Sequence, residues 1–97
     1  MNFKLENDTL IIYLQGQLNS YNAEEVEKEI NSIIDGQTFT HLALDFNVLK
    51  YISSAGLRII MALKQRYNDI VLKRVPNDIN DIFTMVGFHS IITIERQ

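Results

Sequence analysis

Two adjacent serines and two small residues lie at one junction of the sequence "DFNVLKYISSAGLRII", Asp45 to Ile60. The junction separates an apolar run typical of a strand from an apolar run typical of a helix. Because a helix start needs only one capping side chain, the second hydroxyl and the small residues require another explanation. The pattern indicates that a partner docks at this turn, or that one of the serines is modified.

A phosphoryl group on Ser54 would suit this position. The free N–H groups of a helix start and the positive end of its dipole favour an anion, and phosphorylation adds roughly −1.5 to −2 charges. Ala55 and Gly56 would let a kinase or another protein come close to the hydroxyl. Arg58 lies one helical turn after Ser54, and because helical side chains lean toward the N-terminus, its guanidinium could reach the phosphate.

The same residues also suit a purely structural role. Ser53 could be an N-cap, Ser54 an ordinary first-turn residue and Gly56 an accommodation to close packing. Spacing alone leaves the structural and the functional interpretation open.

Hydrophobic periodicity predicts strands and helices in alternation after an opening hairpin. The hairpin joins strands over residues 3–8 and 9–16 through an Asn7–Asp8 turn. The second of these strands is apolar on both faces, which predicts that both faces are covered. Helices are expected over residues 22–36, 53–68 and 77–87, and further strands over residues 40–46, 69–75 and 90–94.

This order, β-β-α-β-α-β-α-β, predicts one α/β domain over residues 1–97, with a mixed central sheet and helices packed against it. Asn22 and Asn77 are predicted N-caps. In open α/β sheets, function tends to lie beyond the carboxyl ends of the strands. We expect residues 47–56 at such a place, where a loop follows a strand that ends at Asp45 or Phe46 and the second helix begins.

Composition narrows the class of protein. The chain of 97 residues has 12 acidic and 9 basic residues, a net charge of −3 and no cysteine. These values weigh against a direct nucleic-acid binder and against a disulfide framework. The N-terminus lacks the apolar core of a signal peptide, and no apolar run approaches the roughly 20 residues that span a bilayer. We expect a cytoplasmic protein without a membrane partner.

The segment "LALDFNVLKYISSAGLRII" resembles the signature of STAS domains, specifically the single-domain anti-sigma factor antagonists of bacteria. The similarity lies in a buried strand with Asp45, an aromatic–apolar pair, Tyr51–Ile52, and the run Ser-Ser-Ala-Gly-Leu over residues 53–57. Weaker similarity in "LQGQLNSYNAEEVEKEI" and "IFTMVGFHSIITI" extends it over nearly the whole chain. The resemblance implies a STAS-like α/β fold and a phosphoprotein of a partner-switching pathway, a form of signal transduction that regulates transcription.

In this family the serine before the small residue and glycine accepts the phosphate, which implies Ser54 here. The unphosphorylated domain is expected to bind an anti-sigma factor that is itself a serine kinase of the histidine-kinase-like ATPase type. Phosphorylation ends that binding, and a PP2C-type serine phosphatase restores it. The resemblance implies no catalytic residue, cofactor or metal in this domain. The expected partner-binding residues are Asn19, Ser53, Ala55, Gly56, Leu57 and Arg58.

Two residues depart from the family pattern. Ser53 and Asn19 stand where the family often has aspartate, so both changes remove negative charge near the expected site. They leave open whether Ser53 is modified instead and whether the usual kinase recognises this chain.

Other functions remain as alternatives. A STAS scaffold or assembly subunit would bind its partners constitutively and without phosphorylation. A serine hydrolase would need Gly-x-Ser-x-Gly, whereas "YISSAG" lacks the first glycine, and His41 and His89 are expected at the surface. The sequence has no metal-ligand spacing and no glycine-rich phosphate-binding motif.

Overall fold

The computed structural model describes residues Met1–Gln97 and confirms the predicted order of elements. The strands are β1 (Asn2–Glu6), β2 (Thr9–Leu18), β3 (His41–Ile52), β4 (Val71–Val75) and β5 (Thr93–Arg96). The helices are α1 (Ala23–Asp35), α2 (Ser54–Arg66), α3 (Asn77–Met85) and the short 3₁₀ helix η1 (Phe88–Ser90). No helix has the length and apolar content needed to cross a membrane.

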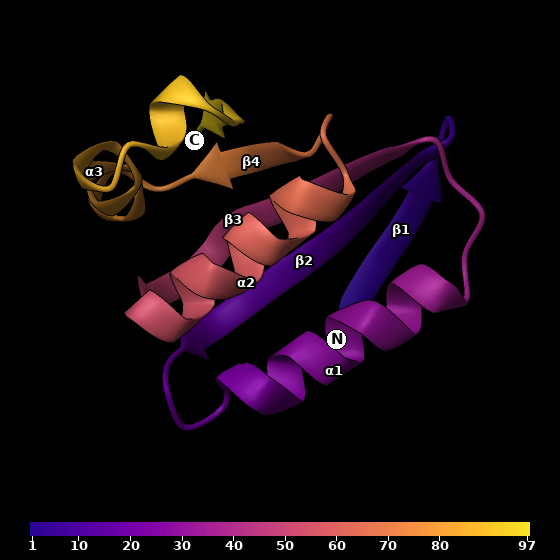
Figure 1. Cartoon of the computed structure of the whole chain (residues 1–97), viewed down its shortest axis with the longest axis horizontal. Coiled ribbons are helices and arrows are strands. Elements are labelled where there is room, and N and C mark those ends of the chain that lie inside the picture. Colours follow the sequence, from indigo (N-terminus) through magenta and orange to yellow (C-terminus); the bar gives the residue numbers. More distant parts are fainter.

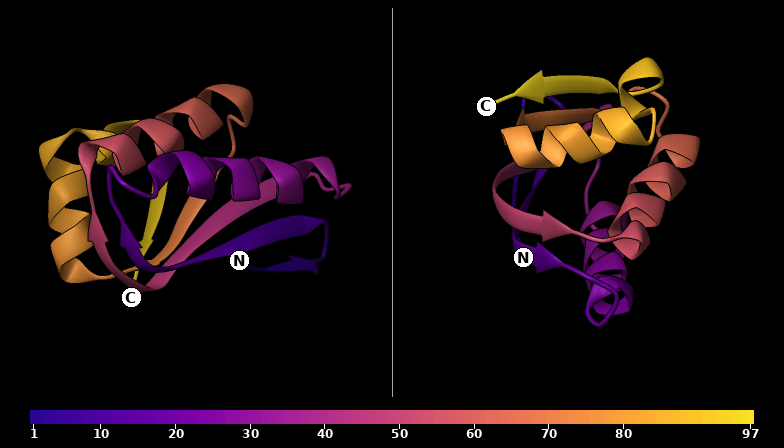
Figure 2. Two further views of the ribbon diagram at one scale, coloured as in Figure 1. Left: turned by 90° about the horizontal axis from the view of Figure 1, so that it is seen from below. Right: turned by 90° about the vertical axis from the view of Figure 1, so that its left-hand side faces the viewer.

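The five strands form one mixed sheet in the order β1-β2-β3-β4-β5 (Figure 1). The pair β1–β2 is antiparallel and the other pairs are parallel. Each crossover moves one strand further in the same direction. Because crossovers between parallel strands are right-handed, helices on such connections must lie on the same side of the sheet. Figure 2 shows α1 and α2 side by side on that face, with α3 at the end of the sheet.

The opposite face of the sheet carries no helix, so the prediction that both faces of β2 are covered is wrong (Figure 2). Leu10, Ile12 and Leu14 point toward the helices and are buried, whereas Ile11 and Tyr13 on the other face are half-buried. These two side chains are flanked by β1 and β3, which shield them without a helix.

The hydrophobic core lies between the sheet and the helices. Near α3 it contains a row of three aromatic rings, in which Phe83 packs edge-on against Phe46 and stacks on Phe88, with ring centroids 5.4 and 5.5 Å apart. Ile79 and Val75 are buried beside this row. These contacts fix α3 at the carboxyl end of the sheet.

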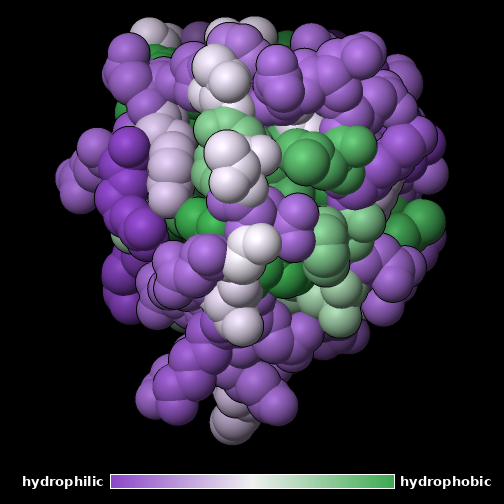
Figure 3. Space-filling model, turned by 90° about the vertical axis from the view of Figure 1, so that its right-hand side faces the viewer, coloured by the Kyte–Doolittle hydropathy of each residue, from purple (hydrophilic) through white to green (hydrophobic).

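The predicted hairpin turn is confirmed. Asn7 and Asp8 both have positive φ, 50° and 68°, which is the conformation of a two-residue type I′ turn. The turn sets β1 along the edge of the sheet, where Phe3 and Leu5 are 44% and 47% exposed. Figure 3 shows the molecule from the right-hand side of Figure 1, where apolar side chains interrupt an otherwise polar surface.

Strand β3 is longer than predicted. Residues 47–52, expected as a loop, continue the strand and pair with β2 as far as Leu18. The pairing contains two register shifts, each with an extra residue in β3. Such bulges bend a strand and break the alternation of its faces. The inward residues Phe46, Leu49 and Ile52 are therefore three apart, so the sequence pattern of a strand is lost although the hydrogen bonding continues.

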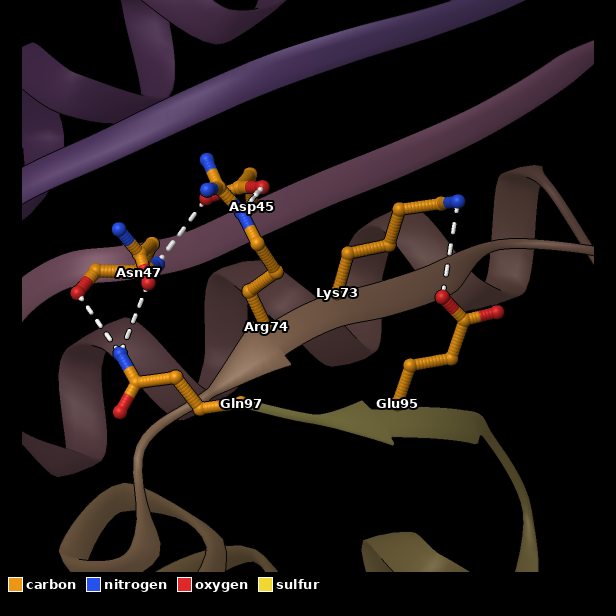
Figure 4. A network of polar contacts seen from close by, with 6 residues as sticks. All are labelled: Asp45, Asn47, Lys73, Arg74, Glu95 and Gln97. Atoms are coloured by element: carbon orange, nitrogen blue, oxygen red, sulfur yellow. Dashed lines mark hydrogen bonds and ion pairs between the residues drawn. The ribbon is translucent and has the colours of Figure 1, made fainter.

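Asp45 is the one buried charged residue and lies on the helix-free face of β3, where its side chain is held by two donors (Figure 4). Arg74 Nε donates to one carboxylate oxygen at 2.7 Å, and the backbone N–H of Asn47 donates to the other at 3.0 Å. The hydrogen bond and the charge of Asp45 raise the pKa of the Arg74 guanidinium. Arg74 reaches this position because β4 is bulged and Arg74 has a φ of 50°.

Three predicted details differ from the structure. Asn22 does not cap α1 through its side chain, because that side chain bonds to the backbone of Gln17 and Asn19 instead. Pro76, not Asn77, is the N-cap of α3. The last strand begins at Thr93, since residues 88–90 form η1.

Replacing Arg74 with methionine should lower the free energy of unfolding by about 1–3 kcal/mol, because the buried Asp45 carboxylate loses a charged donor. The matched control is Lys73→Met, which removes the same charge from an ion pair at 3.5 Å whose side chains are 37% and 54% exposed. That control should stay within about 0.5 kcal/mol of wild type. Urea unfolding followed by circular dichroism measures both, and equal effects would contradict a specific role for the Asp45–Arg74 pair.

Candidate functional site

Ser53 is the N-cap of α2 and has a structural role. Its backbone is extended, and its Oγ accepts a hydrogen bond from the backbone N–H of Gly56 at 3.4 Å. Its carbonyl accepts the N–H of Leu57 at 3.0 Å, and its own N–H donates to the carbonyl of Leu18 at 2.9 Å. Ser53 therefore connects the end of β2 to the first turn of α2 through hydrogen bonds.

Ser54 is the first residue of α2 and is exposed. The N–H groups at the first positions of a helix have no intrahelical acceptor, and Ser53 satisfies only those of Gly56 and Leu57. The first turn contains no acidic residue that would offset the positive end of the helix dipole. The turn around Ser54 is thus accessible and favourable for an anion.

Gly56 is buried, so the prediction that it gives a partner access to the hydroxyl is wrong. A Cβ at this position would lie 2.7 Å from Cγ1 of Ile52 and 2.8 Å from Cγ of Leu18. Real Cβ contacts are not this short, so the absence of a side chain allows α2 to pack directly on the ends of β2 and β3. The structural interpretation of this glycine is the correct one.

The β2–α1 loop lies beside the two serines, because Leu18 pairs with Ile52 in the sheet. Asn19 begins this loop, and its side-chain oxygen accepts the N–H groups of Tyr21 and Asn22 at 2.9 and 3.1 Å. Asn19 therefore shapes the loop next to Ser53, and the structure brings these two predicted residues together.

The remaining predicted residues lie along the first turns of α2. Ala55 and Leu57 are half-buried, whereas Arg58 is exposed and forms no ion pair. Arg58 and Ala62 form a ridge between two hollows, one toward α1 and one toward the connection between α3 and η1.

Sequence reasoning missed two features of this surface. Tyr21, in the loop beside Ser53, is 97% exposed. The only signal for it was a lone aromatic residue in the polar run "NSYNAEE". The hollow between α2 and Val86 was not foreseen, because it is formed by residues far apart in the sequence.

The predicted histidines do not contribute to this site. His41 lies at the first position of β3, at the other end of the strand from Ser53, and its Nδ1 lies 2.5 Å from a carboxylate oxygen of Asp69. His89 lies in η1. Neither histidine forms a hydrogen bond with Ser54, and His89 lines a hollow with residues of α3 and β5.

The family model for the STAS domain matches residues 1–97. The chain belongs to the STAS domain family. Among curated relatives, this STAS domain is 37% identical over 89 residues to BtrV of Bordetella bronchiseptica, which is named as a candidate anti-sigma factor antagonist. That alignment covers 88% of this chain and 76% of BtrV.

Solved structures confirm the fold of this STAS domain. A candidate anti-sigma factor antagonist from Thermotoga maritima superposes with a TM-score of 0.87 at 17% identity, over 99% of this chain and 86% of that one. The anti-sigma factor antagonist SpoIIAA in its unphosphorylated form gives a TM-score of 0.72 at 19% identity, over 96% and 87% of the two chains. SpoIIAA of Bacillus in its phosphorylated form gives 0.65 at 19% identity, over 96% and 90%. The predicted STAS-like arrangement of a mixed sheet and helices is therefore correct.

Replacing Gly56 with alanine should destabilise this STAS domain by about 1–3 kcal/mol, because the new Cβ would overlap Leu18 and Ile52. Gly36→Ala is the control, since a Cβ there would lie 3.5 Å from its nearest neighbour and φ is −87°. That variant should be neutral or more stable by up to about 1 kcal/mol. Thermal and urea unfolding measure both variants, and an unaltered stability of the Gly56 variant would refute the proposed packing constraint.

Proposed function

We propose that this chain is an anti-sigma factor antagonist, a phosphorylation-gated binding module without catalytic activity. In its unphosphorylated form it binds an anti-sigma factor that is also a serine kinase of the histidine-kinase-like ATPase type. Phosphorylation of Ser54 ends that binding, and a PP2C-type serine phosphatase restores it. The protein acts in the bacterial cytoplasm and reaches transcription through its partners, without contacting nucleic acid itself. The names of BtrV and SpoIIAA support this assignment.

The exposed position of Ser54 at the start of α2 is the observation that carries the proposal. Ser53 is engaged in capping and Gly56 in packing, so Ser54 is the hydroxyl of this turn with no assigned structural task. A phosphate there would lie against free N–H groups and the positive end of the helix dipole. The domain itself would tolerate the modification.

A protein bound over this turn would not tolerate the phosphate. The group brings roughly −1.5 to −2 charges into a surface that must be desolvated for close contact. An acidic or apolar partner surface is therefore repelled or left with an unpaired charge. The gating proposed here needs no rearrangement of the antagonist.

A constitutive scaffold with the same fold is the alternative function. It would use the same surface and never carry a phosphate on Ser54. Neither function needs a catalytic base.

The gating proposal predicts that Ser54→Asp loses a partner that the wild-type protein retains in a pull-down from its native cells. Ser54→Asn is the matched control, because it has the same shape without the charge, and it should retain the partner. Mass spectrometry of the native protein should find phosphate on Ser54. Retention by all three baits, with no phosphorylated Ser54 in any growth condition, would favour the scaffold.

Arg58 should contact the phosphate on Ser54, since it lies one turn later on the same helix and has no ion-pair partner. A cation favours the dianion, so Arg58→Gln should raise the second pKa of phosphoserine 54, normally about 6, by a few tenths of a pH unit. Arg66→Gln, the same change at the other end of α2, should leave it unchanged. The ³¹P resonance of protein carrying genetically encoded phosphoserine measures this pKa, and equal values in the two variants would exclude the contact.

A further inference from the structure

The surface next to Ser54 continues into an apolar groove, here named the α2 groove. Its walls are Leu57, Met61 and Gln65 of α2 on one side and Val86 and Phe88 on the other, and its volume is about 280 Å³. Phe88 forms the buried floor, whereas Val86 is 48% exposed. This volume accommodates one or two apolar side chains from another molecule.

Arg58 lies on the rim of the α2 groove at the end nearest Ser54. No carboxylate of the chain forms an ion pair with it, although Glu24 and Glu27 line the hollow on its other side. The positive end of the α2 helix dipole lies near Arg58, and the first turn of α2 contains no acidic residue that would offset it. The groove therefore combines apolar walls with one positively charged end.

We propose, building on the gating function, that the α2 groove binds an amphipathic helix of the partner protein. Apolar side chains of that helix fill the groove, and a carboxylate at its Ser54 end pairs with Arg58. The groove follows α2 from Leu57 to Gln65, about 12 Å at about 1.5 Å per residue, which corresponds to two turns of a helix lying alongside. Helix-in-groove recognition uses apolar anchors spaced over such turns. Met61, with its flexible side chain, adapts the wall to the anchor.

This arrangement explains how a phosphate on Ser54 acts on a partner bound further along α2. Without phosphate, the positive end of the groove attracts the partner's carboxylate. With phosphate, Arg58 and the helix start are occupied by roughly two negative charges from the same chain. The sign of the potential at this end of the groove is then reversed, so the carboxylate is repelled while the apolar walls remain unchanged.

The test uses the protein that the wild type retains and Ser54→Asp loses, purified, with its dissociation constant measured by calorimetry. Met61→Glu and Val86→Glu should each weaken binding at least tenfold, because they place a charge in the apolar groove. Met85→Glu is the matched control, since Met85 is 82% exposed and does not line the groove, and it should stay within threefold of wild type. Thermal unfolding of each variant establishes that it is folded.

The charge part of the proposal has its own variants. Arg58→Glu should weaken binding at least tenfold and Arg66→Glu less than threefold. Exchanging one acidic residue of the partner for lysine should restore binding to Arg58→Glu. If the groove variants or Arg58→Glu bind like wild type while Ser54→Asp does not, the groove proposal is overturned and the gating function stands. If no protein distinguishes wild type from Ser54→Asp, both are overturned.

Discussion

The start of α2 is packed so closely on the ends of β2 and β3 that only a residue without a side chain fits at position 56. The backbone of Ser53 is bound to Leu18 at the same place, so the helix and the sheet share one fixed seam. The direction of α2 follows from this seam, and with it the outward position of Ser54. A small displacement here would move every residue of the site, because all of them except Asn19 lie on the first turns of one helix.

The two neighbouring serines have different roles where the helix meets the sheet. Ser53 accepts and donates hydrogen bonds that hold the turn, whereas Ser54 stands outside it. Ser53 is therefore part of the folded framework of the site, and the Ser54 hydroxyl is the group that can be modified without changing that framework. A charge added to that hydroxyl changes what the surface can bind without disturbing the packing beneath it. On the helix-free face of the sheet, the buried Asp45 carboxylate is held by the exposed Arg74 guanidinium.

The sequence predicted the features that depend on local periodicity. The hairpin turn, the alternation of strands and helices and the position of Ser54 at a helix start all follow from patterns within short windows. The end of β3 was predicted as a loop, because two bulges remove the alternation on which the prediction relied. The two interpretations of Gly56 could not be separated for a different reason: a small residue at a junction has the same sequence signature whether it faces a partner or its own core.

Contacts between distant segments could not be predicted from those windows. Arg74 reaches Asp45 because β4 is bulged and the backbone of Arg74 has a positive φ. Neither feature can be predicted from the residue types alone. The α2 groove likewise exists because Val86 and Phe88 return to α2 after an entire strand and helix. The proposed role of Ser54 as a phosphate acceptor rests on the resemblance to STAS domains together with the electrostatics of a helix start.

The capping bond of Ser53 has a consequence for any enzyme that modifies this turn. A phosphate on Ser53 would add charge and bulk to the oxygen that accepts the N–H of Gly56, where the chain enters the helix. A modification there would alter the cap that holds the turn, whereas the same group on Ser54 would change only the exposed surface. Cα atoms of adjacent residues are about 3.8 Å apart. A shift of one residue in the position of a modification would therefore decide whether it acts on the cap of α2 or on the exposed surface.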